Sequence, residues 1–559
     1  MLYLILYERF KYFDTPRAQV NIVGEDQRMW EKYCSDFDRD FSIQLEENEQ
    51  EMKTWVDTWS QTKTAGMLCP RGISALEEAP ITTYEDYPIL KEFGNALESA
   101  RERTPREKGE SWWDYFKKIE QGPQTILEGW LPEEYGICIK TTGTMGKSKW
   151  IAQGETFFEN HRRASYATTF LICSQDWGST SLRPGDTLLN NSPPIPYLAG
   201  YYAWAIKNDF TFLPPLEVTD TISDMKTKMQ TILKEIDKGT QFDIAGGYAS
   251  IFYTFINYIV SPEILYKDNY QSLPWSMNKV LLFFAYLLAK MKKSRVTHAG
   301  DVLSVKGLAT AGFDVDVYYE KIKEHFGMYP SNSYGSSELG FNLISVPNDR
   351  RKLMPRMRVC YYEYMDASGN IFPIDGVKKD HTYELVGTPF GSLFIRYAIG
   401  DLVRVVDFRD DGMPLFTVEG RTAAVIQIGD YFQVTESLAH TILYQAGLKN
   451  SDRWALTKSL GPGEMLMFLM EKDWSLDELE AAQRIYTALY TLSEDFQKYV
   501  RDYRITVPED VITVKYLKKG AFMRYTIKKI KEGAPLGQYK AKKIIPPGHK
   551  EDIDLLGDI

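Results

Sequence analysis

The chain of 559 residues is too long for a single hydrophobic core, so we expect two or more domains. Its 44% apolar and 25% charged residues are ordinary for a globular protein, and its net charge of −10 argues against a nucleic-acid partner held by bulk electrostatics. The five cysteines are scattered and form no CxxC pair, which argues against a zinc site or a disulfide scaffold and fits a reduced compartment.

The N-terminal segment MLYLILYERFKYF becomes charged after a few residues and lacks the basic start and cleavage site of a secretory signal. The apolar run VLLFFAYLLAKMKK, from Val280, is about half as long as a membrane span requires. We therefore expect a cytoplasmic, soluble enzyme with no membrane span. Residues up to about Gly109 have a helical pattern but contain no motif with a recognisable chemistry.

Beyond this region, predicted strands alternate with predicted helices. Residues 135–140 form a predicted strand and residues 156–168 a predicted helix, and the pattern recurs as a strand at 302–309 and a helix at 315–325. Such alternation over several hundred residues predicts an α/β fold whose sheets are mostly parallel.

The C-terminal part forms a smaller predicted unit. Beyond Gly420 the chain has its own strand, at residues 423–428, and a capping box that begins at Ser475 predicts the start of a helix. We therefore divide the chain into a large N-terminal α/β domain, residues 1–420, and a small α+β C-terminal domain, residues 421–559.

The stretch KTTGTMGKSK, at residues 140–149, follows the predicted strand and has the composition of a phosphate-binding loop. Its GKS end resembles the loop of nucleotide hydrolases, but that pattern requires a glycine where Thr141 stands. The second interpretation is a loop that wraps the phosphates of ATP with backbone N–H groups and hydroxyls, while Lys149 adds positive charge.

Three further motifs follow in order along the chain. In SYGSSELG the ring of Tyr334 can lie beside an adenine, and Glu338 can bind Mg²⁺ through oxygen. In RYAIGD the carboxylate of Asp401 can accept both ribose hydroxyls, and VEGRTAAV places Arg421 after a glycine. Each motif alone is weak evidence, because ordinary turns have the same composition.

The four motifs in this order, TTGTMGxxK, YGSSE, YxxGD and GR, resemble the core motifs of the adenylate-forming superfamily, which includes acyl-CoA synthetases, peptide-synthetase adenylation domains and luciferases. The YGSSE motif and the GQYK ending at residues 537–540 resemble the auxin-responsive acyl acid amido synthetases. The loop and the YRxGD-like element are also similar to those of phenylacetate–CoA ligases. The resemblance extends from about residue 135 onward.

The resemblance implies that the enzyme uses ATP and Mg²⁺ to activate a carboxylic acid as an acyl-adenylate, with release of pyrophosphate. The acyl group would then pass to the amine of an amino acid or to the thiol of coenzyme A, and the residues leave this choice open. The large domain is implied to bind ATP and the acyl substrate, and the small domain to rotate between the two half-reactions.

The implied ATP-binding residues are Thr141, Thr142, Gly143, Thr144, Gly146, Lys149, Ala311, Gly312, Tyr334, Gly335, Ser336, Ser337, Glu338, Asp401 and Arg421. The implied catalytic residues are Lys540, Thr144 and Glu338. Glu338 is also the implied metal ligand.

The sequence departs from the superfamily pattern at several positions. Met145 stands where a phosphate-binding hydroxyl is usual, and Ala423 stands where many members have an aspartate at the hinge. The usual C-terminal motif with a catalytic lysine is not recognisable, so we choose Lys540 in GQYK, with Lys528 and Lys529 as alternatives. These departures keep open a non-catalytic descendant that binds a nucleotide or an acyl ligand without turnover.

Overall fold

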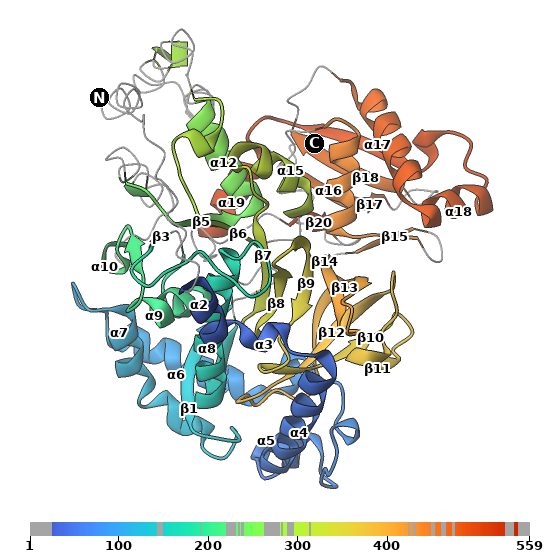
Figure 1. The fold of residues 1–559 in the computed structure, drawn as a ribbon. Helices are drawn as coiled ribbons and strands as arrows, with labels where there is room; N and C mark the ends of the chain where they lie inside the picture. The colour runs from blue at the N-terminus through green and yellow to red at the C-terminus, as the bar shows by residue number, and fades with distance from the viewer. Residues whose placement is uncertain are drawn as a thin grey trace.

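The structure is a computed structural model of the chain. It describes residues 25–141, 149–190, 192–219, 231–232, 235, 240–261, 280, 283–284, 286–287, 296–311, 315–422, 425–428, 432–448, 453–459, 465–471, 476–531 and 542–545. Figure 1 shows the C-terminal helices and strands, in orange and red, to the upper right of the rest of the molecule.

Twelve strands form one sheet in the order β11-β10-β12-β13-β14-β9-β8-β7-β6-β5-β3-β4. Their bounds are β3 (Thr187–Leu189), β4 (Thr211–Leu213), β5 (Ile244–Tyr248), β6 (Gly307–Ala311), β7 (Ser331–Ser336), β8 (Gly340–Val346), β9 (Asp349–Pro355), β10 (Cys360–Met365), β11 (Ile371–Pro373), β12 (Thr382–Pro389), β13 (Tyr397–Phe408) and β14 (Pro414–Arg421).

The sheet is mixed, so the expectation of mostly parallel sheets is not confirmed. The strands from β4 to β7 pair in parallel, whereas every pairing from β7 to β11 is antiparallel. The physical reason is the length of the connections, because short turns can join only antiparallel neighbours and parallel neighbours need a longer crossover. The α/β class itself holds, and the parallel strands are those with helices between them.

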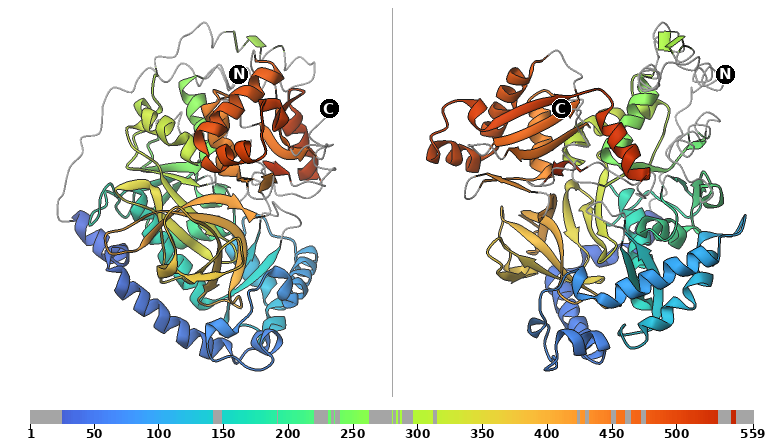
Figure 2. Two further views of the ribbon diagram at one scale, coloured as in Figure 1. Left: turned by 90° about the vertical axis from the view of Figure 1, so that its right-hand side faces the viewer. Right: turned by 180° about the vertical axis from the view of Figure 1, so that it is seen from behind.

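Helices of the N-terminal region pack on this framework (Figure 2). Helix α2 contacts α8, α4 contacts β10, and α6 contacts the strand β2 (Trp150–Gly154), so the described part of the first hundred residues, from Glu25 onward, packs against the main core. The bounds are α2 (Glu25–Tyr33), α3 (Ser35–Asp38), α4 (Phe41–Trp59), α5 (Lys63–Leu68), α6 (Pro88–Arg103), α7 (Trp112–Glu120), α8 (Glu155–Ile172), α9 (Leu198–Ile206), α10 (Leu216–Thr219), α12 (Ala249–Val260) and α15 (Val315–Phe326), with short 3₁₀ segments η1 (Leu76–Glu78), η2 (Tyr84–Asp86), η3 (Pro123–Leu127), η4 (Ala299–Asp301) and η5 (Ile374–Gly376).

A separate hairpin positions the predicted phosphate loop. Strands β1 (Tyr135–Lys140) and β2 (Trp150–Gly154) pair antiparallel, and Lys140 opposite Trp150 is the last pair before the loop. All residues of β2 are buried, and the backbone N–H of Gly154 donates to Gly391 O at 2.7 Å. The hairpin is therefore held on both sides, and α8 begins directly after it.

Two buried arginines hold the C-terminal half of α8. Arg350 Nη1 donates to Leu171 O at 2.9 Å, and a second nitrogen donates to Ser174 O. Arg356 Nη1 donates to Ala164 O at 2.8 Å. Both cations bind helix carbonyls, and Arg350 lies at the C-terminal end of α8, where the helix dipole favours positive charge.

The C-terminal part has its own sheet, in the order β19-β18-β17-β20, and its own cluster of buried apolar residues, from Ile426 to Ile544. Helix α17 begins at Glu478 with Asp477 as its N-cap, whereas the predicted cap Ser475 lies outside the described residues. That residues 1–420 and 421–559 are separate domains stays a prediction. The bounds are β15 (Ile426–Ile428), β16 (Phe432–Val434), β17 (Trp454–Ser459), β18 (Met465–Glu471), β19 (Ile512–Leu517), β20 (Ile544–Ile545), α16 (Glu436–Gln445), α17 (Glu478–Leu492), α18 (Glu494–Asp502), α19 (Ala521–Lys531) and the 3₁₀ segment η7 (Pro508–Asp510).

The carboxyl group of Glu120, the last residue of α7, is buried against β1. Cys138 Sγ donates to Glu120 Oε1 at 2.9 Å. Burial raises the pKa of Glu120 from 4.5 to about 7, although the hydrogen bond from Cys138 and the charge of Lys117 oppose this shift. The folded chain therefore holds a proton on Glu120 over a pH range in which the unfolded chain has lost it.

We expect Glu120→Gln to raise the free energy of unfolding at pH 8 by up to about 3 kcal/mol and to change it little below pH 4.5. Because the folded pKa lies above the unfolded one, the stabilising proton is fully bound below pH 4.5 and is lost as the pH rises through 7. Urea denaturation at pH 4 and pH 8 measures this difference. The exposed Glu102, changed to Gln, is the control, and the same pH dependence in both variants would contradict the prediction.

Candidate active site

Asp401 and Arg421 face each other on neighbouring strands, β13 and β14. Arg421 Nε lies 2.8 Å from Asp401 Oδ1, and Tyr334 OH donates to Asp401 Oδ2 at 2.6 Å. Asp401 is only 1% exposed, and burial raises its pKa while Arg421 and Tyr334 oppose the shift. Both carboxylate oxygens are therefore engaged within the chain, and a ribose that binds here must share or replace these contacts.

Glu338 lies in the turn between β7 and β8, and its side chain is half-buried. The turn is closed by the backbone N–H of Leu339, which donates to Ser336 Oγ at 3.0 Å. Burial raises the pKa of Glu338, the positive charges of Arg421 and Lys149 lower it, and the negative charge of Asp401 raises it. The structure thus brings the predicted Glu338, Asp401, Arg421 and Lys149 into one electrostatic neighbourhood.

Thr141 and Lys149 close the base of the predicted phosphate loop. The N–H of Thr141 donates to Lys149 O at 2.9 Å, and the N–H of Lys149 donates to Thr141 Oγ1 at 2.9 Å. The ammonium group of Lys149 lies 4.3 Å from the centroid of the Tyr84 ring. The loop between them, with Thr142, Gly143, Thr144, Met145 and Gly146, lies outside the described residues, so the roles of its members stay predictions.

Tyr84, in η2, is a site residue that the sequence analysis missed. Its ring is buried and lies against the ammonium group of Lys149, and its hydroxyl donates to Trp150 O at 3.1 Å. It belongs to the N-terminal region, where no motif could have identified it. The buried Tyr397, whose pKa is raised by burial and by the charge of Glu338, belongs to the same surroundings.

If Lys149 binds ATP as its motif predicts, Tyr84→Leu should raise the KM for ATP about two- to fivefold, because a cation–π contact contributes about 0.5–1 kcal/mol. Tyr84→Phe keeps the ring under Lys149 and removes only the hydrogen bond to Trp150, so its KM should stay near that of the wild type. Steady-state pyrophosphate exchange at varied ATP concentration measures both. Equal effects of the two substitutions would show that the ring contact with Lys149 is not the cause.

The remaining predicted residues divide between the described and undescribed parts. Ala311 ends β6 beside Tyr248 at the end of β5, at the carboxyl edge of the parallel strands, where α/β folds bind ligands. A Cβ on Gly335 would lie 2.6 Å from Phe341 Cδ1, so the close approach of β8 requires glycine. Ser337 is half-buried in the same turn as Glu338. Outside the described residues lie Gly312, Ala423 and Lys540.

Arg396, which begins the RYAIGD motif, has a structural role. It is buried, adopts a φ of 44°, and donates from Nε and Nη2 to the two oxygens of Glu363 at 2.9 and 2.8 Å. Its Nη1 donates to Ala79 O at 2.9 Å. This bidentate pair anchors the start of β13, the strand that carries Asp401.

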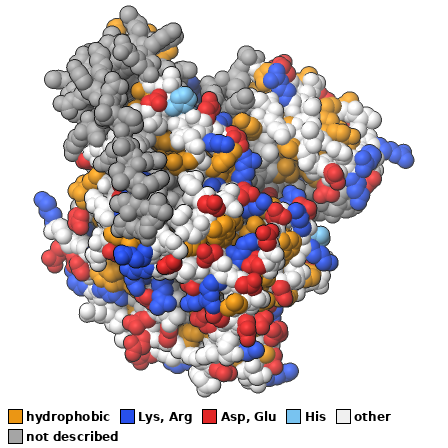
Figure 3. All heavy atoms as spheres, viewed as in Figure 1, with side chains coloured by type: hydrophobic (Ala, Val, Ile, Leu, Met, Phe, Trp, Pro, Cys, Tyr) orange, Lys and Arg blue, Asp and Glu red, His pale blue; other side chains and the backbone are white. Residues whose placement is uncertain are grey.

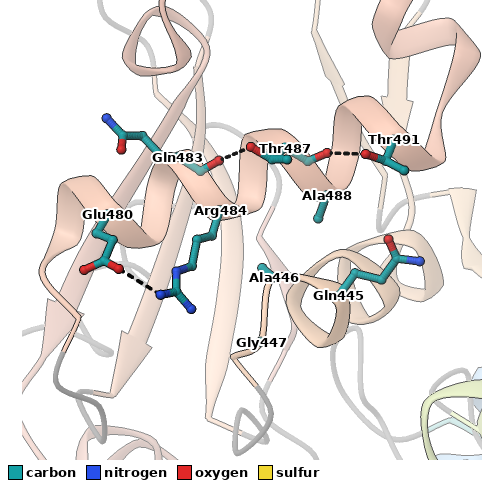
Figure 4. A pocket seen from close by; sticks show the side chains of 9 residues that line it. All are labelled: Gln445, Ala446, Gly447, Glu480, Gln483, Arg484, Thr487, Ala488 and Thr491. Atoms are coloured by element: carbon teal, nitrogen blue, oxygen red, sulfur yellow. Dashed lines mark hydrogen bonds and ion pairs between the residues drawn. The ribbon is translucent and has the colours of Figure 1, made fainter.

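A shallow groove of 520 Å³ lies elsewhere, between the end of α16 and one face of α17 (Figure 4). Its lining is polar, and its Arg484 is paired with Glu480 at 2.8 Å. None of the predicted site residues lines it. On the face shown in Figure 3, acidic and basic side chains are interspersed.

The described residues contain no group of three or more His, Cys, Asp or Glu side chains that could hold a metal ion by themselves. Among the same residues, no helix has the length and apolar character needed to cross a membrane.

Comparison with known proteins addresses the strands that carry Asp401 and Arg421. Residues 353–421 match the GH3 family central domain. The matched segment runs from β9 to the end of β14 and contains Asp401, Arg421 and the Arg396–Glu363 pair.

Curated relatives whose names also contain GH3 match part of the chain. A probable indole-3-acetic acid-amido synthetase, GH3.4, of Oryza sativa subsp. japonica is 25% identical over 248 residues, which cover 38% of this chain and 38% of that protein. A 4-substituted benzoates-glutamate ligase, GH3.12, of Arabidopsis thaliana is 28% identical over 243 residues, or 39% of this chain and 41% of that protein. The chain thus matches less than half of the length of these relatives.

The solved structure of the AtGH3.15 acyl acid amido synthetase in complex with 2,4-DB matches 92% of this chain and 93% of its own, with a TM-score of 0.63 at 17% identity. This likeness establishes the shared fold over nearly the whole chain. The resemblance to the acyl acid amido synthetases is therefore confirmed by the central-domain match and by these relatives.

Proposed function

We propose that the protein is an acyl-adenylate-forming ligase that uses ATP to activate a carboxylic acid, releases pyrophosphate, and transfers the acyl group to the amine of an amino acid. The observation that carries this proposal is the convergence of Lys149, Glu338, Asp401 and Arg421. These residues come from four separate motifs, yet the charges of Lys149, Asp401 and Arg421 all act on the pKa of Glu338. A site with two carboxylates and two cations suits a nucleotide triphosphate with its metal ion.

The chemistry explains why such charges are needed. A carboxylate is a poor electrophile because it is already anionic, and attack of its oxygen on the α-phosphorus of ATP converts it to a mixed anhydride. Catalysis of this step consists mainly of positioning and of neutralising charge on the phosphates. In the proposed site Thr141 and Lys149 frame the loop around the departing pyrophosphate, Asp401 fixes the ribose, and Tyr334 lies beside the adenine.

The proposed site also fits Mg²⁺. Magnesium in nucleotide sites is usually held by one or two carboxylates together with substrate phosphates. Glu338 supplies such a carboxylate, which is half-buried, and the charges of Arg421 and Lys149 oppose the rise in its pKa that burial causes. When bound, the ion would offset negative charge on the phosphates. This role does not require three or more acidic side chains, and the described residues contain no such metal-binding group.

An amino acid is the acceptor that the relatives favour, because their names describe an amido synthetase and a benzoate–glutamate ligase. In this proposal the C-terminal part, residues 421–559, is a small mobile domain and Lys540 is its catalytic lysine. A cytoplasmic location also belongs to the proposal, since all five cysteines are buried and free.

Acid-dependent exchange of labelled pyrophosphate into ATP tests the first half-reaction. The panel of acids should include indole-3-acetate, substituted benzoates and short aliphatic acids. We expect exchange with at least one of them, followed by discharge of the adenylate by an amino acid. Discharge by coenzyme A alone would make the protein a CoA ligase. Phosphate release without an acid requirement would indicate a hydrolase, and ligand binding without turnover would indicate a non-catalytic descendant.

A further inference from the structure

Gln153 lies near the end of β2, four residues beyond Lys149, and is completely buried. Its Nε2 donates to Glu338 O at 3.0 Å and lies 3.5 Å from Ser337 O. Its backbone pairs with Ile137 of β1 on one side and bridges to Ser392 on the other. One side chain therefore links the strand that leaves the phosphate loop to the turn that carries Glu338.

The side chain of Gln153 joins a fully buried strand, β2, to the short turn between β7 and β8. Every residue of β2 is buried, and a Cβ on the next residue, Gly154, would lie 2.2 Å from Glu133 Oε1, so the strand has no room to shift. The turn at Glu338, in contrast, contains one internal side-chain hydrogen bond, from the N–H of Leu339 to Ser336 Oγ. A group held by packing on such a strand can fix a neighbouring catalytic side chain closely.

The bond from Gln153 to the carbonyl of Glu338 is part-buried. A carbonyl that loses its partner away from water costs up to about 1–3 kcal/mol, so the turn would move toward water or another donor if Gln153 lost its amide. The carboxylate of Glu338 would move with it. A displacement of about 1 Å in a positioned group can lower a rate about a hundredfold.

We propose that Gln153 is a positioning residue that holds Glu338 in place relative to β2, the strand that follows Lys149. In this proposal Gln153 acts through the backbone of residues 337–338 and not by contact with the nucleotide or the acid. The inference rests on the proposed function, because it assumes that Glu338 binds Mg²⁺ together with ATP.

The test compares Gln153→Met with a matched control, Asn48→Leu. Asn48 of α4 is also a buried amide whose Nδ2 donates to two backbone carbonyls, those of Met357 and Cys360. Like Gln153, it has a side-chain oxygen with no partner among the described residues. The two substitutions therefore remove comparable hydrogen bonds, but only one of them supports Glu338.

Two measurements report on the position of Glu338. Calorimetric titration of ATP at varied Mg²⁺ should show that Gln153→Met needs at least about tenfold more Mg²⁺ for half-maximal binding, while Asn48→Leu matches the wild type. Hydrogen–deuterium exchange should show faster exchange of residues 336–341 in Gln153→Met alone. If Gln153→Met does not fold, Gln153→Asn, which retracts the amide by one methylene, takes its place with the same expected results.

A wild-type Mg²⁺ dependence and wild-type exchange in a folded Gln153 variant would overturn the inference while leaving the proposed function intact. Changes of the same size in the Asn48 variant would also overturn it, because they would reflect general destabilisation. If the wild type neither binds ATP with Mg²⁺ nor catalyses acid-dependent exchange, the proposed function fails and the inference fails with it.

Discussion

Glu338→Gln is expected to lower acid-dependent pyrophosphate exchange at least about a hundredfold, the scale for removing a contact made to charge in the transition state. The amide keeps the size of the side chain and the backbone bond to Gln153, but it removes the negative charge that would hold Mg²⁺. Exchange rates at saturating ATP and acid measure the effect. Raising Mg²⁺ should restore part of the lost rate, because the defect lies in metal affinity.

The pH profile provides a second readout for Glu338. Burial raises the pKa of this carboxyl, so activity of the wild type should fall as the pH decreases through that raised pKa, and Glu338→Gln should lose this acid limb. Glu320 of α15, which is exposed and paired with Arg351, is a suitable control position for the same Glu→Gln change. Near-normal exchange by a folded Glu338→Gln variant would remove Glu338 from the site.

Asp401→Ala should have an effect of similar size, at least about a hundredfold on exchange. The substitution removes the proposed ribose acceptor and also leaves Tyr334 OH and the guanidinium of Arg421 without their shared partner. Loss of one member of a buried ion pair is strongly destabilising, but Arg421 is 35% exposed, so water can solvate it in part. Thermal denaturation is therefore needed beside the exchange assay.

Two further substitutions separate binding from stability at this position. Asp401→Asn preserves the shape of the side chain and should lose most of the exchange activity while keeping more of the melting temperature than Asp401→Ala. Tyr334→Phe removes only the hydroxyl that donates to Asp401 and should cost less than about tenfold. If Asp401→Asn is folded and exchanges at the wild-type rate, the ribose assignment is wrong.

The residues that converge at the site were predictable where a motif carried their chemistry. Asp401 and Arg421 each follow a glycine, and Glu338 lies in the turn between β7 and β8, so each belongs to a short motif that combines a turn residue with a polar group. Sequence alone also indicated the α/β class. The contributions of Tyr84 and Gln153 were not predictable, because each depends on a contact between segments far apart in the chain.

The sequence contains short polar turns between strands of the antiparallel half of the sheet, and the sequence analysis did not use them. Pro347 and Asn348 separate β8 from β9, and DASGN separates β10 from β11. In the second turn, the carboxylate of Asp366 accepts from the N–H groups of Ser368 and Asn370, a local bond typical of tight turns. Short polar turns between β-prone segments predict hairpins, so they argue against a mostly parallel arrangement.

The hydrogen bonds that Arg350 and Arg356 donate to α8 differ in kind from the ion pairs at the surface. The bonded partners of their guanidinium groups are carbonyl and hydroxyl oxygens, which do not titrate in water, and both arginines are buried, where dissolved salt screens charge poorly. Acid or high ionic strength weakens carboxylate pairs such as Lys140–Glu98, which lies at the end of β1. The bonds that hold the C-terminal half of α8 are by contrast less sensitive to acid and to salt.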